Sequence, residues 1–238
     1  MPCLIRGCNH GILQDINIVN CIRFGFNWRV YMLEKATEWL SNHAPKIVEA
    51  LQEPASTDKI KELETLVGKN LPESFFTLYQ TYNGINPDMF ANFAYGMPFI
   101  SIEQTISQIT EFELPNDKTN LNYADDGIKV GYSFGKLRVP IGDDSGTCLI
   151  CVDLDPDING TYGQVILIDY DHNIALKLAD SVENYIETFT SDLLSGRYSL
   201  QEDALEDGVH WLQPEKEIDP GNWFSSPTWQ YVPGHNCS

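Results

Sequence analysis

The sequence predicts an α+β fold with amino-terminal helices, a central mixed or mostly antiparallel sheet of about five to six strands, and a closing helix. Two observations predict this class. Apolar residues recur at helical spacing between residues 32 and 82, whereas short apolar runs bounded by glycine and aspartate occupy residues 128–178. Because helices and strands occupy separate parts of the chain, their order favours α+β over an alternating α/β fold.

Four helical segments are predicted before residue 85. The apolar face of the first consists of Leu33, Ala36, Trp39 and Leu40, and a short second segment follows it. Ser56 or Thr57 caps the third helix, and Gly68 ends it. Pro72 is placed at the first position of the fourth helix, where a missing N–H is tolerated, and Gly84 follows its last turn.

Two further helices each begin with a predicted capping box. Ser101 with Gln104 opens a helix after a weakly patterned loop, and Asp180 with Glu183 opens the closing helix. Gly196 lies where the closing helix is expected to end.

Five strands are predicted between these two helices. Each is a short apolar run bounded by turn residues, a pattern typical of strands covered on both faces. The expected strands are Ile128–Phe134, Leu137–Ile141, Thr147–Asp153, Gly163–Asp169 and Ile174–Leu178. Glycine and aspartate are dense in the turns between them, so the loops of this meander display carboxylates.

The chain is predicted to consist of one domain, residues 32–198, with an extension at each end. Residues 1–31 hold three arginines and one aspartate, a balance of +2, whereas the remainder carries a net −21. We expect Met32 to be the native start and residues 1–31 to be a non-native or disordered extension. Residues 199–238 form an acidic extension that we expect to pack on the domain through Trp211, Leu212, Trp223, Phe224 and Trp229, the alternative being an aromatic partner-binding strip.

Net charge restricts the class of partner. The 238 residues carry a formal charge of −19, which repels phosphate backbones and anionic lipid and so argues against nucleic acid or membrane as the partner. A basic protein would be attracted instead, although an acidic surface also serves solubility alone. The sequence contains neither an apolar stretch long enough to span a membrane nor a secretory signal, so we expect a cytoplasmic location.

The cysteines do not indicate a metal or disulfide framework. Cys148 and Cys151 are spaced C-x-x-C inside a predicted strand, where positions three apart face opposite sides of the sheet. We therefore expect two buried, inert thiols. The spacing of Cys3, Cys8, His10 and Cys21 fits no standard zinc finger.

The residues of the helices and the meander together resemble the Smi/Knr superfamily, also called SUKH. The helical part of this resemblance is Leu63-Glu64, Gly68, Leu71-Pro72-Glu73, Phe75, Leu78-Tyr79 and Asn83-Gly84. The meander contributes Pro140-Ile141-Gly142-Asp143-Asp144, Leu149 to Asp153, Asp155-Pro156 and Gly163-Gln164-Val165. The order of these motifs along residues 32–198 is what makes the resemblance specific. The chain departs from the family's glycine run after the paired aspartates, having Ser145-Gly146-Thr147.

The resemblance implies a protein-binding role. Bacterial members of the superfamily are typically immunity proteins that neutralise polymorphic toxins, often nucleases, and fungal members regulate cell-wall assembly. It also implies the same order of elements that the patterns predict: helices, sheet and closing helix.

The aspartate-rich loops raise the question of a metal site. Asp155-x-Asp157-x-Asn159-Gly160 matches the opening of a calcium loop, but the twelfth position is Ile166, where that loop needs a bidentate glutamate. An ordinary aspartate-rich turn is therefore the favoured interpretation, and no metal or cofactor is expected. None of the five histidines lies in a recognisable nucleophile, base or zinc motif, so no catalytic residue is assigned.

The predicted function is a non-enzymatic protein-binding module, a bacterial immunity protein whose acidic loops cover the basic surface of a toxin domain. The predicted partner-binding residues are Asp143, Asp144, Asp155, Asp157 and Tyr162. Two alternatives stay open: a Smi/Knr-like scaffold or regulator without toxin neutralisation, and, with the least support, a metal-dependent hydrolase.

Overall fold

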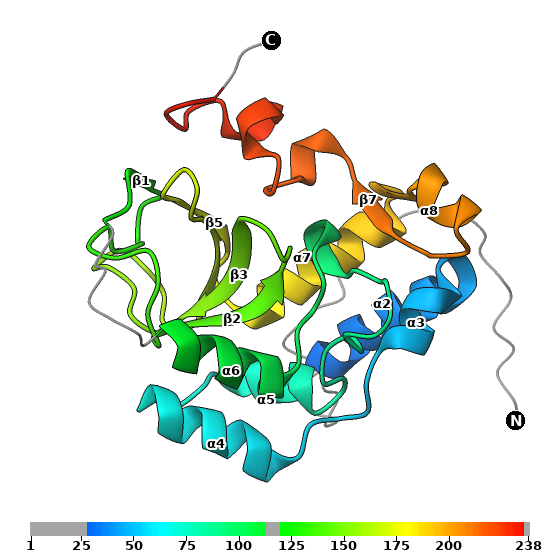
Figure 1. The fold of residues 1–238 in the computed structure, drawn as a ribbon, viewed down its shortest axis with the longest axis horizontal. Helices are drawn as coiled ribbons and strands as arrows, with labels where there is room; N and C mark the ends of the chain where they lie inside the picture. Colours follow the sequence, from blue (N-terminus) through cyan, green and yellow to red (C-terminus); the bar gives the residue numbers. More distant parts are fainter. Residues whose placement is uncertain (1–27, 113–119, 236–238) are drawn as a thin grey trace, which may run out of the picture.

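The structure of the chain is a computed structural model that describes residues 28–112 and 120–235. Its α-helices are α2 (Trp28–His43), α3 (Pro45–Ala50), α4 (Thr57–Val67), α5 (Glu73–Tyr79), α6 (Ile102–Phe112), α7 (Val182–Leu194) and α8 (Glu202–Glu206). Its strands are β1 (Tyr123–Ala124), β2 (Arg138–Asp143), β3 (Cys148–Asp153), β4 (Gln164–Asp169), β5 (Ile174–Ala179), β6 (Tyr198–Leu200) and β7 (Leu212–Pro214). Short 3-10 helices are η2 (Ala94–Gly96), η3 (Lys216–Ile218), η4 (Trp223–Ser225) and η5 (Pro227–Trp229). Figure 1 shows the amino-terminal helices below and beside the sheet, with the last residues crossing above it.

The main sheet confirms the predicted α+β class. Its five strands lie in the order β1-β5-β4-β3-β2, with β1 parallel to β5 and every other pair antiparallel. The helix α7 follows the sheet as predicted and packs on it, and the small hairpin β6–β7 comes after α7.

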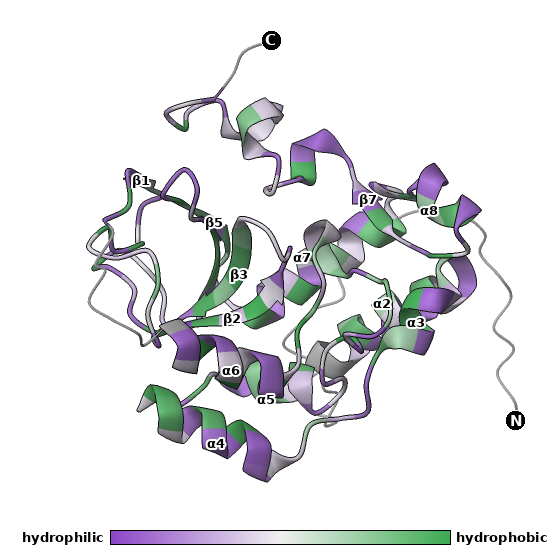
Figure 2. Cartoon of the chain, viewed as in Figure 1, coloured by the Kyte–Doolittle hydropathy of each residue, from purple (hydrophilic) through white to green (hydrophobic). Residues whose placement is uncertain are grey.

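Both faces of the central strands are covered. Ile150, Leu167 and Leu176 are paired across β3, β4 and β5 and belong to the main core, which the helices share. The alternate residues Leu149, Cys151, Ile166, Ile168 and Ala175 belong to a second cluster on the opposite face. This two-sided burial explains why the strands read as continuous apolar runs, and Figure 2 shows them as hydrophobic ribbon at the centre of the molecule.

The two central cysteines lie on opposite faces of the sheet, as predicted. Cys148 belongs to the main core and Cys151 to the second cluster. Burial raises the pKa of Cys148 to about 12 and raises that of Cys151 as well, so both thiols stay protonated.

Most helix boundaries follow the predicted caps. Ser56 Oγ accepts the Lys59 N–H at the start of α4, and Gly68 ends that helix with φ +71°. The capping box of α6 is reciprocal, since Ser101 Oγ accepts the Gln104 N–H and Gln104 Oε1 accepts the Ser101 N–H.

Two cap assignments were wrong. The cap of α7 is Ser181, whose Oγ accepts the Asn184 N–H, rather than Asp180. Pro72 is the residue before α5 instead of its first helical residue. Both errors are shifts of a single residue, the scale on which helix ends vary.

The predicted strand Ile128–Phe134 was also wrong, because these residues are irregular and the first strand is the short β1 instead. The guanidinium of Arg138 accounts for the difference. It donates to the carbonyl oxygens of Lys129, Tyr132 and Ser133, which a strand would have used for its ladder. The segment still covers the sheet, since Ile128 packs in the second cluster.

The C-terminal residues pack on the domain at three places. Asn92, fully buried, donates to the Leu212 carbonyl at 2.8 Å and accepts the Leu212 N–H at 2.7 Å, which joins β7 to the segment before η2. Trp223 Nε1 donates to Asp169 Oδ2 at 2.9 Å, and Trp229 and Val232 belong to the main core. The exposed helix α8 carries acidic side chains.

At the other end of the described chain, α2 begins at Trp28, upstream of Met32, and residues 1–27 lie outside the described residues. The cysteines Cys3, Cys8 and Cys21 fall in that part, as does His10. None of the helices in residues 28–112 and 120–235 is both long and apolar enough to cross a membrane.

Candidate partner-binding groove

The five predicted partner-binding residues lie at opposite ends of β3. Asp143, the last residue of β2, and Asp144, in the turn after it, precede β3, whereas Asp155, Asp157 and Tyr162 follow β3 in the β3–β4 loop. Since a strand rises about 3.3 Å per residue, the six residues of β3 separate the two groups by roughly 17 Å. The structure therefore brings the residues together as two groups and not as one surface.

The β2–β3 turn is held by its own carboxylates. Asp144 Oδ1 accepts the N–H groups of Gly146 at 2.8 Å and Cys148 at 2.9 Å, and Asp143 Oδ1 accepts the Ser145 N–H at 2.7 Å. Ser145 adopts φ +56°, which these bonds stabilise. Asp144 stays exposed, so the turn presents negative charge in a fixed position.

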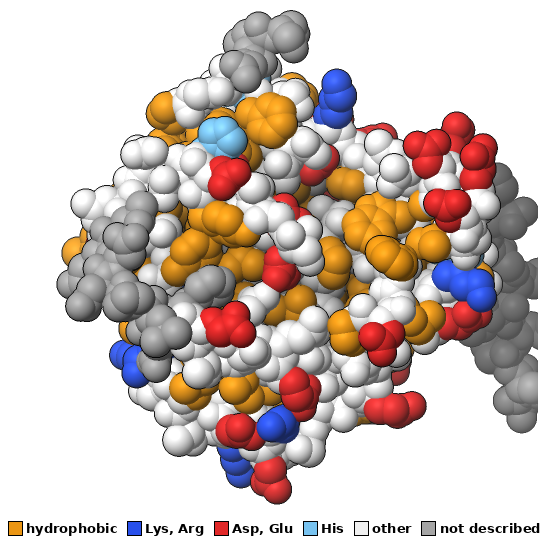
Figure 3. All heavy atoms as spheres, viewed as in Figure 1, with side chains coloured by type: hydrophobic (Ala, Val, Ile, Leu, Met, Phe, Trp, Pro, Cys, Tyr) orange, Lys and Arg blue, Asp and Glu red, His pale blue; other side chains and the backbone are white. Residues whose placement is uncertain are grey.

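Beside this turn lies a groove of about 350 Å³. Its walls are the β2–β3 turn, the segment 85–100, the first turn of α6 and the residue before β7. The floor is apolar and includes Phe99 and Ile100, which are buried. The lining also includes the half-buried Asp143, the exposed Asp144 and Phe90, which is 80% exposed. Figure 3 shows hydrophobic side chains gathered on this face beside the acidic side chains over α8.

The groove is completed by the C-terminal extension. Trp211, one residue before β7, is half-buried and lines the groove. Two contacts hold Trp211 in position. Asn92 hydrogen-bonds the N–H and the carbonyl of the next residue, Leu212, and the Trp211 carbonyl accepts the Gln201 N–H at 2.9 Å. Phe90 was not assigned from the sequence, and Trp211 was named only in the alternative of an aromatic partner-binding strip, because no local pattern shows that segments more than a hundred residues apart meet.

At the other end of β3, the predicted residues are engaged within the protein. Asp155 forms an ion pair with Lys129 and accepts the Tyr132 hydroxyl at 3.1 Å. Burial raises the pKa of Asp155, but these two donors outweigh it and hold the pKa below its usual value. Tyr162 donates its hydroxyl to the Asn70 carbonyl at 2.6 Å and so links this loop to the segment before α5.

The sequence match to a calcium loop has a packing explanation. A Cβ at Gly160 would lie 2.2 Å from the Gly127 carbonyl oxygen, so the glycine is needed for a close approach of two loops. Asn159 Nδ2 donates to Asp126 at 3.0 Å, and Asp157 Oδ1 accepts the Ile158 N–H at 2.8 Å. Within the described ranges, no group of three or more His, Cys, Asp or Glu side chains could hold a metal ion.

A carboxylate that sequence reasoning left unassigned is Asp169. Its side chain is almost fully buried at the end of β4, where it accepts the His172 and Trp223 ring N–H groups at 2.9 Å. The rings of His172 and Trp223 pack edge to face, 5.5 Å apart. These contacts attach the C-terminal extension to the end of β4.

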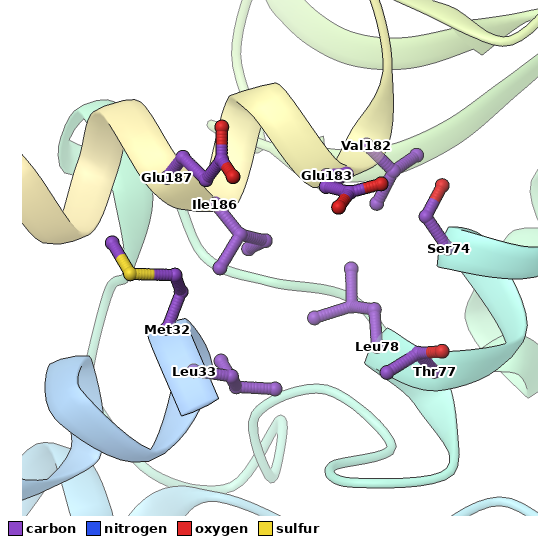
Figure 4. Close-up of a pocket in the computed structure, with 9 residues that line it drawn as sticks. All are labelled: Met32, Leu33, Ser74, Thr77, Leu78, Val182, Glu183, Ile186 and Glu187. Atoms are coloured by element: carbon purple, nitrogen blue, oxygen red, sulfur yellow. The ribbon is translucent and has the colours of Figure 1, made fainter. Parts of the chain in front are cut away.

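Figure 4 shows a small pocket between α2, α5 and α7. Apolar side chains of Leu33, Leu78 and Ile186 point into it, with Met32 at its edge. Its volume of about 20 Å³ suits one water molecule and no larger ligand. The pocket is therefore a packing defect between helices rather than a binding site.

Comparison with known proteins identifies a family. No curated protein matches the chain. The family model described as SMI1/KNR4 (SUKH-1) matches residues 54–188, more than half of the chain, from before α4 into α7. Trp211 and the C-terminal extension lie beyond the match. The resemblance found in the helical and meander motifs is confirmed, and the chain belongs to the SMI1/KNR4 (SUKH-1) family.

Proposed function

We propose that this protein is a non-enzymatic binding module, a bacterial immunity protein that neutralises a toxin domain by covering its basic functional surface. The family is one of toxin-immunity and Smi/Knr-like modules, which supports binding over catalysis. The observation that carries the proposal is the β2–β3 turn, where two carboxylates are fixed beside an apolar groove on a protein of net charge −19.

The proposed mechanism has two steps. Long-range attraction between the acidic protein and a basic toxin surface raises the association rate, most strongly at low salt. Burial of a few apolar side chains then slows dissociation. Asp143 and Asp144 are the favoured charged contacts. Asp155 and Asp157 belong to the other end of β3 and would serve a second contact on a large partner.

Growth rescue tests the function itself. The full chain is expressed together with the protein encoded beside it in its genome, in a sensitive host. Rescue of growth supports immunity. If a neighbouring toxin kills equally with and without this protein, the immunity proposal is wrong.

The charged contact is tested with Asp144→Asn, which removes the charge but keeps the Oδ1 acceptor that the turn requires. We expect slower association with the toxin and a weaker dependence of that rate on salt. Stopped-flow kinetics at several salt concentrations measures both. Asp58→Asn is the control, because it removes one exposed charge in the first turn of α4, outside the groove lining and outside the predicted contacts. Equal association kinetics for wild type and Asp144→Asn would show that Asp144 makes no charged contact with the toxin.

A Smi/Knr-like scaffold or regulator is the second candidate, since the family includes modules of that kind. It would use the same groove for a protein that is not a toxin. The growth assay separates the two functions: a bound partner that is not toxic when expressed alone supports the scaffold.

A further inference from the structure

We propose that the groove beside the β2–β3 turn receives an aromatic or large aliphatic side chain that the partner presents between basic residues. The inference rests on the proposed protein-binding function and names the chemistry of the segment that is recognised. The groove, the charges of its lining and its exposed aromatic side chain are three separate observations that point to the same occupant.

The size and lining of the groove define the apolar part of the occupant. The groove of about 350 Å³ has room for a large side chain, and its floor of Phe99 and Ile100 offers no charge. Phe90 in the lining is 80% exposed, and Met89 beside it is 36% exposed. Exposed aromatic and methionine side chains around a hollow are typical of the anchor points of protein interfaces.

The charges around the groove define the flanking part of the occupant. The lining includes two carboxylates, Asp143 and Asp144, and none of its described residues is Lys or Arg. The Trp211 carbonyl accepts the Gln201 N–H directly before α8, whose Glu202, Asp203 and Glu206 are exposed. An apolar side chain with Lys or Arg on both sides complements this arrangement, whereas an acidic segment would be repelled.

The full-length protein and three synthetic peptides test the inference. The first peptide carries one phenylalanine between flanking lysine and arginine residues. The second has alanine in place of the phenylalanine, and the third has glutamate in place of the basic residues. Fluorescence anisotropy at low salt measures binding. We expect the first peptide to bind about tenfold more tightly than the second and the third not to bind.

Two variants assign the effect to the groove. Phe90→Ala removes a side chain that is 80% exposed, so the fold is expected to stay intact, and circular dichroism checks this. The tenfold preference for the phenylalanine peptide should disappear in Phe90→Ala. Ile158→Ala is the control, since Ile158 is 93% exposed on the β3–β4 loop at the opposite end of β3, and it should keep the full preference.

Three results would overturn the inference: equal binding of the phenylalanine and alanine peptides, a preference that survives in Phe90→Ala, or no binding of any peptide. Self-association that Phe90→Ala abolishes, measured by sedimentation, would also overturn it by making a second copy of this chain the occupant. The outcome of the growth assay, which tests the immunity function, does not depend on these results. Conversely, if growth rescue fails while the peptides bind as expected, the immunity proposal is wrong and the inference about the groove still holds.

Discussion

The side chain of Arg138 explains why residues 128–134 do not form a strand of the sheet. It is 2% exposed and stacks over the Tyr132 ring, with 4.2 Å from its Cζ to the ring centroid. Its guanidinium donates to three carbonyl oxygens of the segment 129–133, which therefore folds over the sheet as an irregular cover. A buried planar group with several donors is needed here, which lysine cannot provide.

Arg138→Met is expected to lower the free energy of unfolding by about 3 kcal/mol, because it leaves the three carbonyls without their donor while roughly keeping the apolar volume. Urea denaturation followed by circular dichroism measures the change. The control Lys46→Met removes the same charge from an exposed position and should change stability by less than about 1 kcal/mol. Equal stability of Arg138→Met and wild type would contradict this role.

A neighbouring pair of aspartates shows how local contacts decide ionisation. Asp153 and Asp155 are two residues apart. Burial raises the pKa of Asp153, although its carboxylate accepts the Asp155 N–H and the Gln164 amide. The pKa of Asp155 is lowered despite some burial, because Lys129 and Tyr132 donate to it. The nearby Arg138 also lowers the pKa of Asp153, but burial outweighs it, whereas the direct ion pair with Lys129 stabilises Asp155 as a carboxylate and ties it to the loop.

At the scale of elements, the hairpin β6–β7 carries Trp211, which lines the groove, and the side chain of Asn92 joins this hairpin to the segment before η2. Asn92 is fully buried and makes two hydrogen bonds with the backbone of Leu212, in place of a neighbouring strand. Tyr198 of β6 adds a contact to η2, since its hydroxyl accepts the Tyr95 N–H at 3.1 Å. Trp211 is positioned by this hairpin.

Asn92→Ala is expected to loosen the hairpin, because both backbone groups of Leu212 lose their partner, at a cost of about 2 kcal/mol. Amide hydrogen exchange should quicken in residues 198–214, most clearly at Leu212, and stay unchanged in β3 and β4. Asn42→Ala serves as the control, since Asn42 is exposed and donates only to the Glu38 carbonyl within α2. Unchanged exchange at Leu212 would show that the hairpin does not depend on Asn92.

At the scale of the whole molecule, the helices, the sheet and the C-terminal extension share one core. The main cluster contains Ile60 of α4, Leu167 of β4 and Trp223 near the C-terminus. The indole N–H of Trp223 also donates to the nearly buried Asp169 carboxylate. We expect such a molecule to unfold in one cooperative step.

Trp223→Phe is expected to lower the free energy of unfolding by about 2 kcal/mol, since it removes a hydrogen bond to a carboxylate and some packing. Tryptophan fluorescence and far-ultraviolet circular dichroism should give coincident urea transitions for wild type and variant. Trp211→Phe makes the same replacement at a half-buried indole and should have the smaller effect. Two separate transitions in wild type would mean that the extension is an independent unit.

The order of elements, the strands β2–β5, the opposite faces of Cys148 and Cys151, and the caps at Ser56 and Ser101 were all predictable from sequence. They depend on side-chain periodicity and on hydrogen bonds within three or four residues, which the local sequence determines. The groove was not predictable, because Phe90, Asp143 and Trp211 meet only when the sheet has formed and Asn92 has bound β7. Distant contacts of this kind follow from packing and leave no trace in local spacing.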